Sequence, residues 1–311
     1  MNYQHISVLR DEAVDLLNCK VGGIFVDGTI GGGGHAMEIL KRISPDGMLV
    51  GIDLDGSAVR ASEERLKQFG AKKKIIKGNF ADIDNILDGL HLENVDGILV
   101  DVGVSSHQLE ETQRGFSFMR EAILDMRMAD DAKLNAFDIV NDYSESELSL
   151  IIKEYGEERM AKKIAKSICL QRAIAPIRTT TELATLIARI YPQRMHARGI
   201  HPATKTFQAI RIAVNDELEN LKTFLAKVTS RINKGGRLAI ISFHSLEDRI
   251  VKQAFVEMAS SCICPRNIPI CGCGKQATIK IITKKPIVAS AQEVENNFSS
   301  RSAKLRVAER I

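Results

Sequence analysis

Hydrophobic and polar positions alternate regularly over the first hundred residues. Short, nearly continuous apolar runs predict buried strands at 24–26, 48–55, 74–80 and 95–103. The segments between them carry apolar residues at helical spacing, at 34–42, 57–69 and 82–90. Because buried strands that alternate with amphipathic helices form βαβ units, the pattern predicts a doubly wound, mostly parallel sheet with right-handed crossovers.

The alternation stops after the fourth strand. Residues 105–202 show helical or irregular patterns and no buried strand, and strand patterns then return at 236–243, 278–283 and 304–310. Between these segments we expect one long helix over 205–232 and another over 246–259. The pattern therefore predicts an α/β domain with a seven-stranded sheet, made of residues 1–104 and 203–311, and an inserted all-helical domain at 105–202.

A run of four glycines, Gly31 to Gly34, joins the first strand to its helix and ends in His35. Such a turn lets a ligand lie against the backbone. Asp53 ends the second strand, nineteen residues after Gly34, where a carboxylate can accept hydrogen bonds from ribose hydroxyls. Together these features favour a nucleotide-like ligand over a simple flexible turn.

The acid Asp27 stands just before the glycines. A negative charge there repels a pyrophosphate but suits a ligand that carries an ammonium and a sulfonium group. The loop also lacks the G-x-G-x-x-G spacing of dinucleotide sites. We therefore expect S-adenosylmethionine rather than a nicotinamide dinucleotide.

Two further residues follow predicted strands. Asp101 lies at the carboxyl end of the fourth strand, where open α/β sheets place ligands and chemistry. Phe80 ends the third predicted strand, and its ring either packs on an adenine or belongs to the core.

Charge is unevenly distributed along the chain. Residues 159–211 contain 11 Lys or Arg and one acid, whereas residues 107–158 contain 5 basic and 13 acidic residues. A basic region of this size suits a polyanion such as nucleic acid, although a solvated helix face remains the alternative.

Composition and targeting signals narrow the class further. With 44% hydrophobic and 26% charged residues the chain has an ordinary globular composition, and it has neither an apolar run of membrane-spanning length nor a signal-peptide pattern. We expect a cytoplasmic protein that does not associate with membranes.

The six cysteines form no disulfide framework in a chain of this length. Cys19 and Cys169 fit reduced packing residues. The others form two Cys-x-Cys pairs, Cys262 with Cys264 and Cys271 with Cys273. Each pair is separated by one residue, whereas the paired cysteines of structural zinc sites are usually separated by two to four. We therefore expect a reduced loop without a metal, and a zinc site remains the alternative.

Several longer blocks resemble one family. These blocks include DGTIGGGGHA, DVGVSSHQL, ARGIHPATKTFQAIRIAVNDEL, GGRLAIISFHSLEDRIVK and RSAKLRVAER, and the similarity runs nearly from end to end. They are similar to the bacterial 16S ribosomal RNA cytosine-N4 methyltransferases, the RsmH or MraW family. Ser7 stands where the family usually has proline, and the stretch NNFSS before RSAKLR also departs from its pattern.

The resemblance implies a class I methyltransferase fold, S-adenosylmethionine as cofactor, and transfer of a methyl group to N4 of a cytidine in the decoding region of small-subunit ribosomal RNA. It implies cofactor contacts from Gly33, Gly34, His35, Asp53, Phe80, Asp101 and Gln108. His35 then caps the loop with a polar group at a helix start.

The N4 amine is a poor nucleophile because its lone pair is delocalised into the ring. Methyl transfer therefore needs a protein group that accepts a hydrogen bond from this amine. We expect Asp101 to fill this role, with Ser105 and Ser106 as secondary candidates. Phe116 or Phe118 can stack on an extruded base, or else pack in the core.

Two more segments have competing interpretations. Arg198, His201 and Lys205 surround a predicted helix start, and we expect them to contact RNA backbone, with a capped hinge as the alternative. The segment SFHSLEDR superficially suggests a hydrolase triad, but it lacks a nucleophile elbow and Ser245 fits a helix N-cap.

Three rival functions remain at this stage. They are a methyltransferase acting on DNA or protein, a non-catalytic ribosome-assembly factor that binds RNA and senses the cofactor, and a nicotinamide dehydrogenase.

Overall fold

The computed structural model describes residues 7–104, 114–192, 201–262, 264 and 272–311. Within these residues the chain divides into two compact units, one formed by 1–103 with 218–311 and the other by 104–217. In the described part of the chain no helix is both long and apolar enough to span a membrane.

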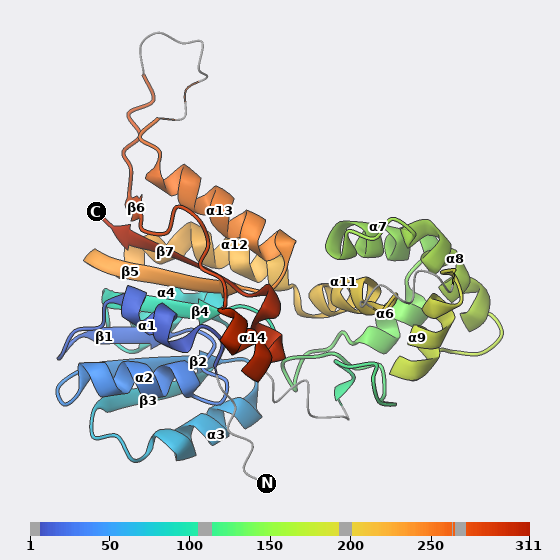
Figure 1. Cartoon of the computed structure of the whole chain (residues 1–311), viewed down its shortest axis with the longest axis horizontal. Coiled ribbons are helices and arrows are strands. Elements are labelled where there is room, and N and C mark those ends of the chain that lie inside the picture. Colours follow the sequence, from blue (N-terminus) through green and yellow to red (C-terminus); the bar gives the residue numbers. More distant parts are fainter. Residues whose placement is uncertain (1–6, 105–113, 193–200, 263, 265–271) are drawn as a thin grey trace. The chain divides into compact units, whose positions relative to one another are not determined.

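The first unit is built on a sheet in the order β3-β2-β1-β4-β5-β7-β6 (Figure 1). Its strands are β1 (Ile24–Asp27), β2 (Met48–Asp53), β3 (Lys72–Lys77), β4 (Val95–Asp101), β5 (Ile232–Ser242), β6 (Ile279–Ile281) and β7 (Lys304–Arg310). β1 to β5 pair in parallel, and β7 runs antiparallel to both β5 and β6. The predicted seven-stranded, mostly parallel α/β fold is therefore confirmed.

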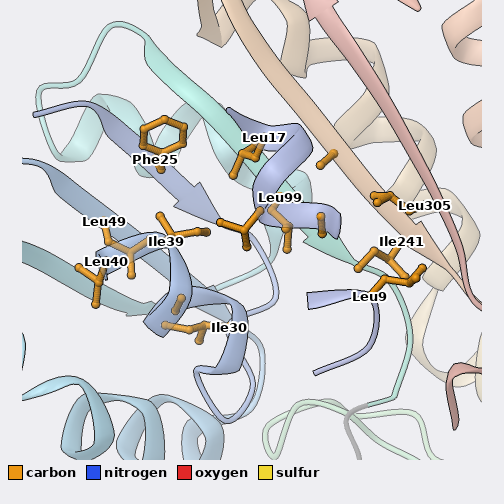
Figure 2. Close-up of a cluster of buried hydrophobic side chains, with 14 of the residues drawn as sticks. Leu9, Leu17, Phe25, Ile30, Ile39, Leu40, Leu49, Leu99, Ile241 and Leu305 are labelled. Atoms are coloured by element: carbon orange, nitrogen blue, oxygen red, sulfur yellow. The ribbon is translucent and has the colours of Figure 1, made fainter. Parts of the chain in front are cut away.

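Helices cover both faces of this sheet because its strands are apolar on both sides. On one face Phe25 and Leu99 pack with α1 (Arg10–Leu17), α2 (Gly34–Ile43) and Leu66 of α3 (Gly56–Leu66), as Figure 2 shows for part of this cluster. On the other face Val26 and Ile98 pack with α4 (Ile83–Gly89), α12 (Glu217–Lys227) and α13 (Ser245–Ala259). Neighbouring residues of one strand thus belong to opposite cores, as in buried parallel sheets.

The second unit is helical. It contains α6 (Ala136–Asp142), α7 (Glu145–Gly156), α8 (Ala161–Arg172), α9 (Thr180–Ala188) and α11 (Thr204–Asn215). A capping box formed by Thr179 and Glu182 begins α9. Similar boxes begin α6 and α7.

The limits of the helical unit differ from the predicted 105–202. Its last helix, α11, was assigned to the α/β domain from sequence, but it packs closely on α7. A Cβ on Gly156 would lie 2.7 Å from the carbonyl oxygen of Lys205, so the two helices come together where α7 has no side chain. The unit therefore extends to Glu217.

The single long helix predicted over 205–232 is wrong. Asp216 has φ 49°, a left-handed conformation that ends α11, and α12 begins at the next residue. Because Asp tolerates this conformation better than most residues, the chain can break here without a glycine. After α12, a 3-10 helix (Val228–Arg231) leads into β5.

Two short elements complete the first unit. α14 (Ala291–Asn296) is capped by Ser290, and a 3-10 helix (Phe298–Ser302) leads into β7.

Candidate active site

Three acids end three adjacent strands of the first unit. Asp27 is the last residue of β1, Asp53 of β2 and Asp101 of β4. Because β2, β1 and β4 are parallel neighbours, these carboxylates lie at one edge of the sheet. In open α/β folds this edge is where ligands bind.

The glycine loop lies at the same edge and is tied to it by hydrogen bonds. The amide of Gly31 donates to Oδ2 of Asp53 at 2.8 Å, and Gly28 donates to the carbonyl of Leu99 at 2.8 Å. Gly31 and Gly33 have φ values of 49° and 76°, which only glycine adopts without strain. The loop thus needs glycine at these positions for its backbone course, whether or not a ligand is present.

Gly34 serves a purpose that the sequence did not reveal. A Cβ added to it would lie 1.9 Å from Oγ of Ser7, which is buried. The space beside Gly34 is therefore filled by the chain's own N-terminal segment rather than by a ligand. Gly34 can still contact a cofactor through its backbone.

We expect Gly34→Ala to destabilise the protein by about 1–2 kcal/mol, because overpacking a filled site costs on that order. In a Ser7→Ala background the nearest remaining atom is Cβ of residue 7 at 3.1 Å, and the added methyl needs only a small shift. The cost of Gly34→Ala should therefore shrink by at least half. Urea unfolding of both single variants and of the double variant gives the coupling free energy between positions 7 and 34. If Gly34→Ala costs the same in both backgrounds, a clash with Ser7 is not the cause.

His35 is buried rather than a surface cap. Its Nε2 donates to the carbonyl of Val8 at 3.0 Å, which holds the N-terminal segment over α2. Its Nδ1 faces Oδ2 of Asp101 at 3.9 Å. His35 therefore fixes the N-terminal segment to the start of α2 and lies beside the carboxylate at the end of β4.

Asp27 is fully buried, and burial raises its pKa to about 7, with the nearby charge of Asp53 adding to the effect. One oxygen accepts from the amide of Thr29 at 3.3 Å, and the backbone amide of Ala36 also lowers the pKa, but Oδ2 has no partner within hydrogen-bond distance among the described residues. A buried carboxylate without a full set of donors is costly to ionise. A cationic ligand at this edge would relieve that cost.

Asp101 has a similar environment but is more accessible, since 22% of its side chain is exposed. Burial, then the charges of Asp27 and Glu247, raise its pKa well above the usual range for aspartate. Within the described residues its Oδ1 is buried without a hydrogen-bond partner. Asp101 is thus the acid of this pair that a substrate can reach.

Asp53 is held in a fixed orientation. Its Oδ2 accepts from Gly31 and its Oδ1 accepts from the amide of Asp55 at 2.9 Å. A carboxylate oxygen can accept more than one hydrogen bond, so these two contacts are compatible with binding of ribose hydroxyls by Asp53.

The prediction that Phe80 ends the third strand is wrong. β3 stops at Lys77, and Phe80 begins a 3-10 helix (Phe80–Asp82) capped by Asn79. Its ring meets that of Phe224 edge to face, with centroids 5.4 Å apart, and is only partly buried. The ring of Phe80 therefore packs partly in the core, against Phe224 of α12.

The aromatic pair of the helical unit has different environments. Phe116 is buried, with the guanidinium of Arg114 5.8 Å from its ring centroid. Phe118 is partly exposed, and its ring lies 4.9 Å from Phe207 and 4.7 Å from His201. Of the two, only Phe118 offers a ring surface to a base without rearrangement.

The predicted RNA contacts are placed only in part. His201 accepts a hydrogen bond from the amide of Ala203 at 3.2 Å, and Lys205 donates to the carbonyl of Glu157 at 3.0 Å, beyond the end of α7. Both side chains are in exposed residues, and both support the local fold. Arg198, Gln108, Ser105 and Ser106 lie outside the described residues.

The hydrolase interpretation is not supported by the geometry of SFHSLEDR. Asp248 forms ion pairs with Arg306 at 2.6 Å and with Lys304 at 3.3 Å, so its carboxylate is paired with side chains of β7. The N-cap of α13 is His244, in a capping box with Glu247, and not Ser245 as was predicted. The segment anchors a helix to the sheet.

Sequence reasoning missed three residues that shape the site. Thr29 accepts a hydrogen bond from the amide of Asp101 at 2.7 Å, and Ser7 and Val8 contact the start of α2. Thr29 lies inside the glycine loop, which was a usable signal. Ser7 and Val8 are far from the loop in sequence and gave none.

The comparisons with known proteins agree with this architecture. The profile described as the MraW methylase family matches residues 2–311. Proteins named ribosomal RNA small subunit methyltransferase H are similar over nearly the whole chain. One from Syntrophus aciditrophicus is 52% identical over 99% of this chain and 98% of its own, and one from Clostridioides difficile is 50% identical over 100% of both.

A solved rRNA methylase from Streptococcus thermophilus aligns over 99% of both chains, with a TM-score of 0.45 and 10% identity, too distant a likeness to add to the assignment. The profile match alone covers far more than half of the chain. The two relatives match nearly the whole chain and are identical to it at about half of the aligned positions, which supports the same family assignment. The chain therefore belongs to the MraW methylase family.

Proposed function

We propose that this protein transfers a methyl group from S-adenosylmethionine to the exocyclic N4 amine of a cytidine in the 16S RNA of the small ribosomal subunit. The observation that carries the proposal is the pair of acids at adjacent strand ends beside a glycine loop, the buried Asp27 and the partly exposed Asp101. Family membership and the names of the relatives support the reaction class and the substrate.

The residues at the sheet edge fit S-adenosylmethionine. Asp53 at the end of β2 is placed to accept from ribose hydroxyls, and the oxygens of Asp27 and Asp101 that have no hydrogen-bond partner in the described part of the chain suit positive charge. The cofactor supplies an electrophilic methyl group on a sulfonium. A dinucleotide fits less well, because its pyrophosphate would lie next to the two acids.

Asp101 is the residue we assign to the substrate amine. Its carboxylate can accept an N4–H hydrogen bond, which raises electron density on nitrogen and gives the departing proton a place to go. The positive charge of the cofactor favours the ionised form of Asp101, and because burial raises its pKa, that carboxylate is a stronger proton acceptor than an ordinary aspartate. Thr29 accepts a hydrogen bond from the backbone amide of Asp101 and fixes the backbone there, and most of the enzyme's contribution is positioning.

The helical unit offers a surface for RNA. Lys162, Lys163 and Lys166 of α8 are all exposed, and their spacing places them on one side of that helix. No acid occurs from 159 to 181, so this face is positively charged. We assign it, with Arg198, His201 and Lys205, to contact with the phosphate backbone.

Replacing Lys162, Lys163 and Lys166 by Glu should weaken binding to ribosomal RNA by about tenfold or more and reduce the slope of log affinity against log salt by about two, since each lost phosphate contact contributes about 0.7–0.9. Filter binding from low to moderate salt measures both. The matched control changes Lys20, Lys72 and Lys74, which are exposed in the first unit, to Glu. Equal effects from both triple variants would show that only net charge matters.

A methyl-transfer assay tests the proposed function directly. Labelled S-adenosylmethionine is offered with assembled small subunits, free ribosomal RNA, duplex DNA or total protein, and the product nucleoside is identified by mass spectrometry. We expect N4-methylcytidine from small-subunit RNA in one of the first two reactions. If only DNA or only protein becomes labelled, the proposed RNA substrate is wrong. If the protein binds ribosomal RNA and S-adenosylmethionine but transfers no methyl group, a non-catalytic assembly factor is favoured.

A further inference from the structure

The loop between α13 and β6 brings three cysteines together (the orange segment after α13 in Figure 1). The Sγ atoms of Cys262, Cys264 and Cys273 all lie within 4.8 Å of one another. Cys271, the fourth cysteine of this segment, lies outside the described residues, and no part of the site is assigned to it. The cluster belongs to the first unit and is separate from the acids at the sheet edge.

The spacing of the sulfurs fits a shared metal ion. Sγ of Cys273 is 3.9 Å from Sγ of Cys262, far beyond the roughly 2.05 Å of a disulfide. Zinc–sulfur bonds of about 2.3 Å in a tetrahedron place neighbouring sulfurs about 3.8 Å apart. Three thiolates at such distances repel one another unless a cation lies between them.

Hydrophobic burial does not explain why these thiols converge. Cys262 is exposed, Cys264 and Cys273 are only partly buried, and Gly272 and Gly274 next to Cys273 are exposed. Cys19 is also partly buried, but it packs against the apolar core as a small apolar residue, and burial raises the pKa of its thiol to about 12. The cluster lies instead where a metal can reach it.

The backbone around the sulfurs has features that stabilise thiolates. The amide of Cys264 donates to Sγ of Cys262 at 3.3 Å, so the single intervening residue brings an N–H group onto a sulfur. Such outer hydrogen bonds orient ligands and stabilise their charge. Gly274 has φ 64°, which lets the chain turn directly after Cys273. The tight Cys-x-Cys spacing is therefore compatible with ligation.

Both ends of the loop are fixed to the last turn of α13. Lys275 donates to the carbonyl of Glu257 at 2.7 Å, and the amide of Thr278 donates to the carbonyl of Met258 at 2.9 Å. On the other side, Ser260 Oγ donates to the carbonyl of Cys262 at 2.6 Å. Residues eleven positions apart in sequence are thus held together before any metal binds.

We propose that Cys262, Cys264 and Cys273 bind one zinc ion as thiolates and that this structural site closes the base of the loop. Each thiol loses its proton to solvent when it ligates, so binding strengthens as pH rises. Soft thiolate ligands select zinc over magnesium or calcium. The site is independent of the proposed methyl transfer, because none of its residues lies at the sheet edge.

The metal content of the full-length protein tests the site. The protein is purified without a polyhistidine tag or chelator, and its metals are measured by inductively coupled plasma mass spectrometry. We expect about one zinc per chain in the wild type and less than about a fifth of that in Cys262→Ser, Cys264→Ser and Cys273→Ser. Cys169→Ser, which changes a partly buried cysteine of α8, is the matched control and should keep its zinc.

Thiol reactivity gives a second measurement that does not depend on activity or on how well a variant folds. In the wild type, iodoacetamide should label the three cysteines slowly, and much faster after zinc is removed by a chelator. A metal-free wild type whose three thiols react at the same rate with and without chelator would overturn the proposal. So would a Cys262–Cys273 disulfide in freshly purified protein, or full zinc retention in all three variants.

Discussion

Asp101→Asn should reduce single-turnover methyl transfer by about 10²–10⁴-fold, the range that a positioned proton acceptor contributes. Asn has the same shape, so it keeps the side chain in place at the end of β4, but its amide cannot take a proton. The dissociation constant for S-adenosylmethionine should change only a few-fold, because Asp53 and the glycine loop remain intact. Calorimetry and rapid-quench methyl transfer measure the two quantities separately.

The matched control is Asp82→Asn, which changes an exposed aspartate in the 3-10 helix that follows β3. It should leave both binding and turnover unchanged. If Asp101→Asn keeps the wild-type rate, Asp101 has no part in the chemistry. If instead the variant loses cofactor binding in proportion to its rate, Asp101 is a binding residue only.

The fold was predictable from the sequence because buried parallel strands have a strong local signature. The strand predicted at 304–310 has the observed limits, and the first four strands were located to within a few residues. The break at Asp216 was not predictable, since it lies between two amphipathic stretches with the same period and no glycine marks it. The position of α11 depends on its contact with α7, which no local pattern encodes.

The site was predictable where it depends on strand ends and not where it depends on the N-terminal segment. Asp53 and Asp101 follow from their places after apolar runs. By contrast, His35 is polar and stands at a helix start, a position that is usually exposed, and only its contact with Val8 explains its burial. Gly34 was attributed to ligand approach because Ser7 is 27 residues away in the chain.

The cysteine segment shows a different limit of sequence reasoning. Its spacing argued against a metal, whereas the structure places three sulfurs together through hydrogen bonds to α13 that spacing rules do not consider. Metal sites formed by a loop and its anchors are therefore harder to recognise from sequence than sites formed by regularly spaced ligands on one element.

Asp27→Asn should make the ligand-free protein more stable at pH 8 while weakening cofactor binding. The pKa of Asp27 is about 7 in the folded protein against 3.8 for an ordinary aspartate. Between these values the folded state keeps a proton that the unfolded state has lost, so the stability from this group is complete below about pH 4 and is lost as pH rises through 7. The full effect is on the order of 4 kcal/mol.

The variant resembles the protonated side chain and cannot lose that stability. The free energy of unfolding of Asp27→Asn minus that of the wild type should be about 1 kcal/mol at pH 4.5 and reach about 4 kcal/mol at pH 8, measured by urea unfolding without cofactor. Asp46→Asn, at an exposed position between α2 and β2, should show no such rise. A difference that stays flat with pH would mean that Asp27 is not held in a costly environment.

Cofactor affinity should change in the opposite direction. At pH 8 the wild-type carboxylate of Asp27 is ionised and attracts a cationic ligand, so its replacement should weaken S-adenosylmethionine binding by about tenfold or more. Loss of the Asp27 charge also removes one cause of the raised pKa of Asp101. A variant that gains stability and loses affinity would show that the buried charge is kept for binding, since sites of this kind often lower stability in the empty protein. A gain in stability with unchanged affinity would separate Asp27 from the cofactor.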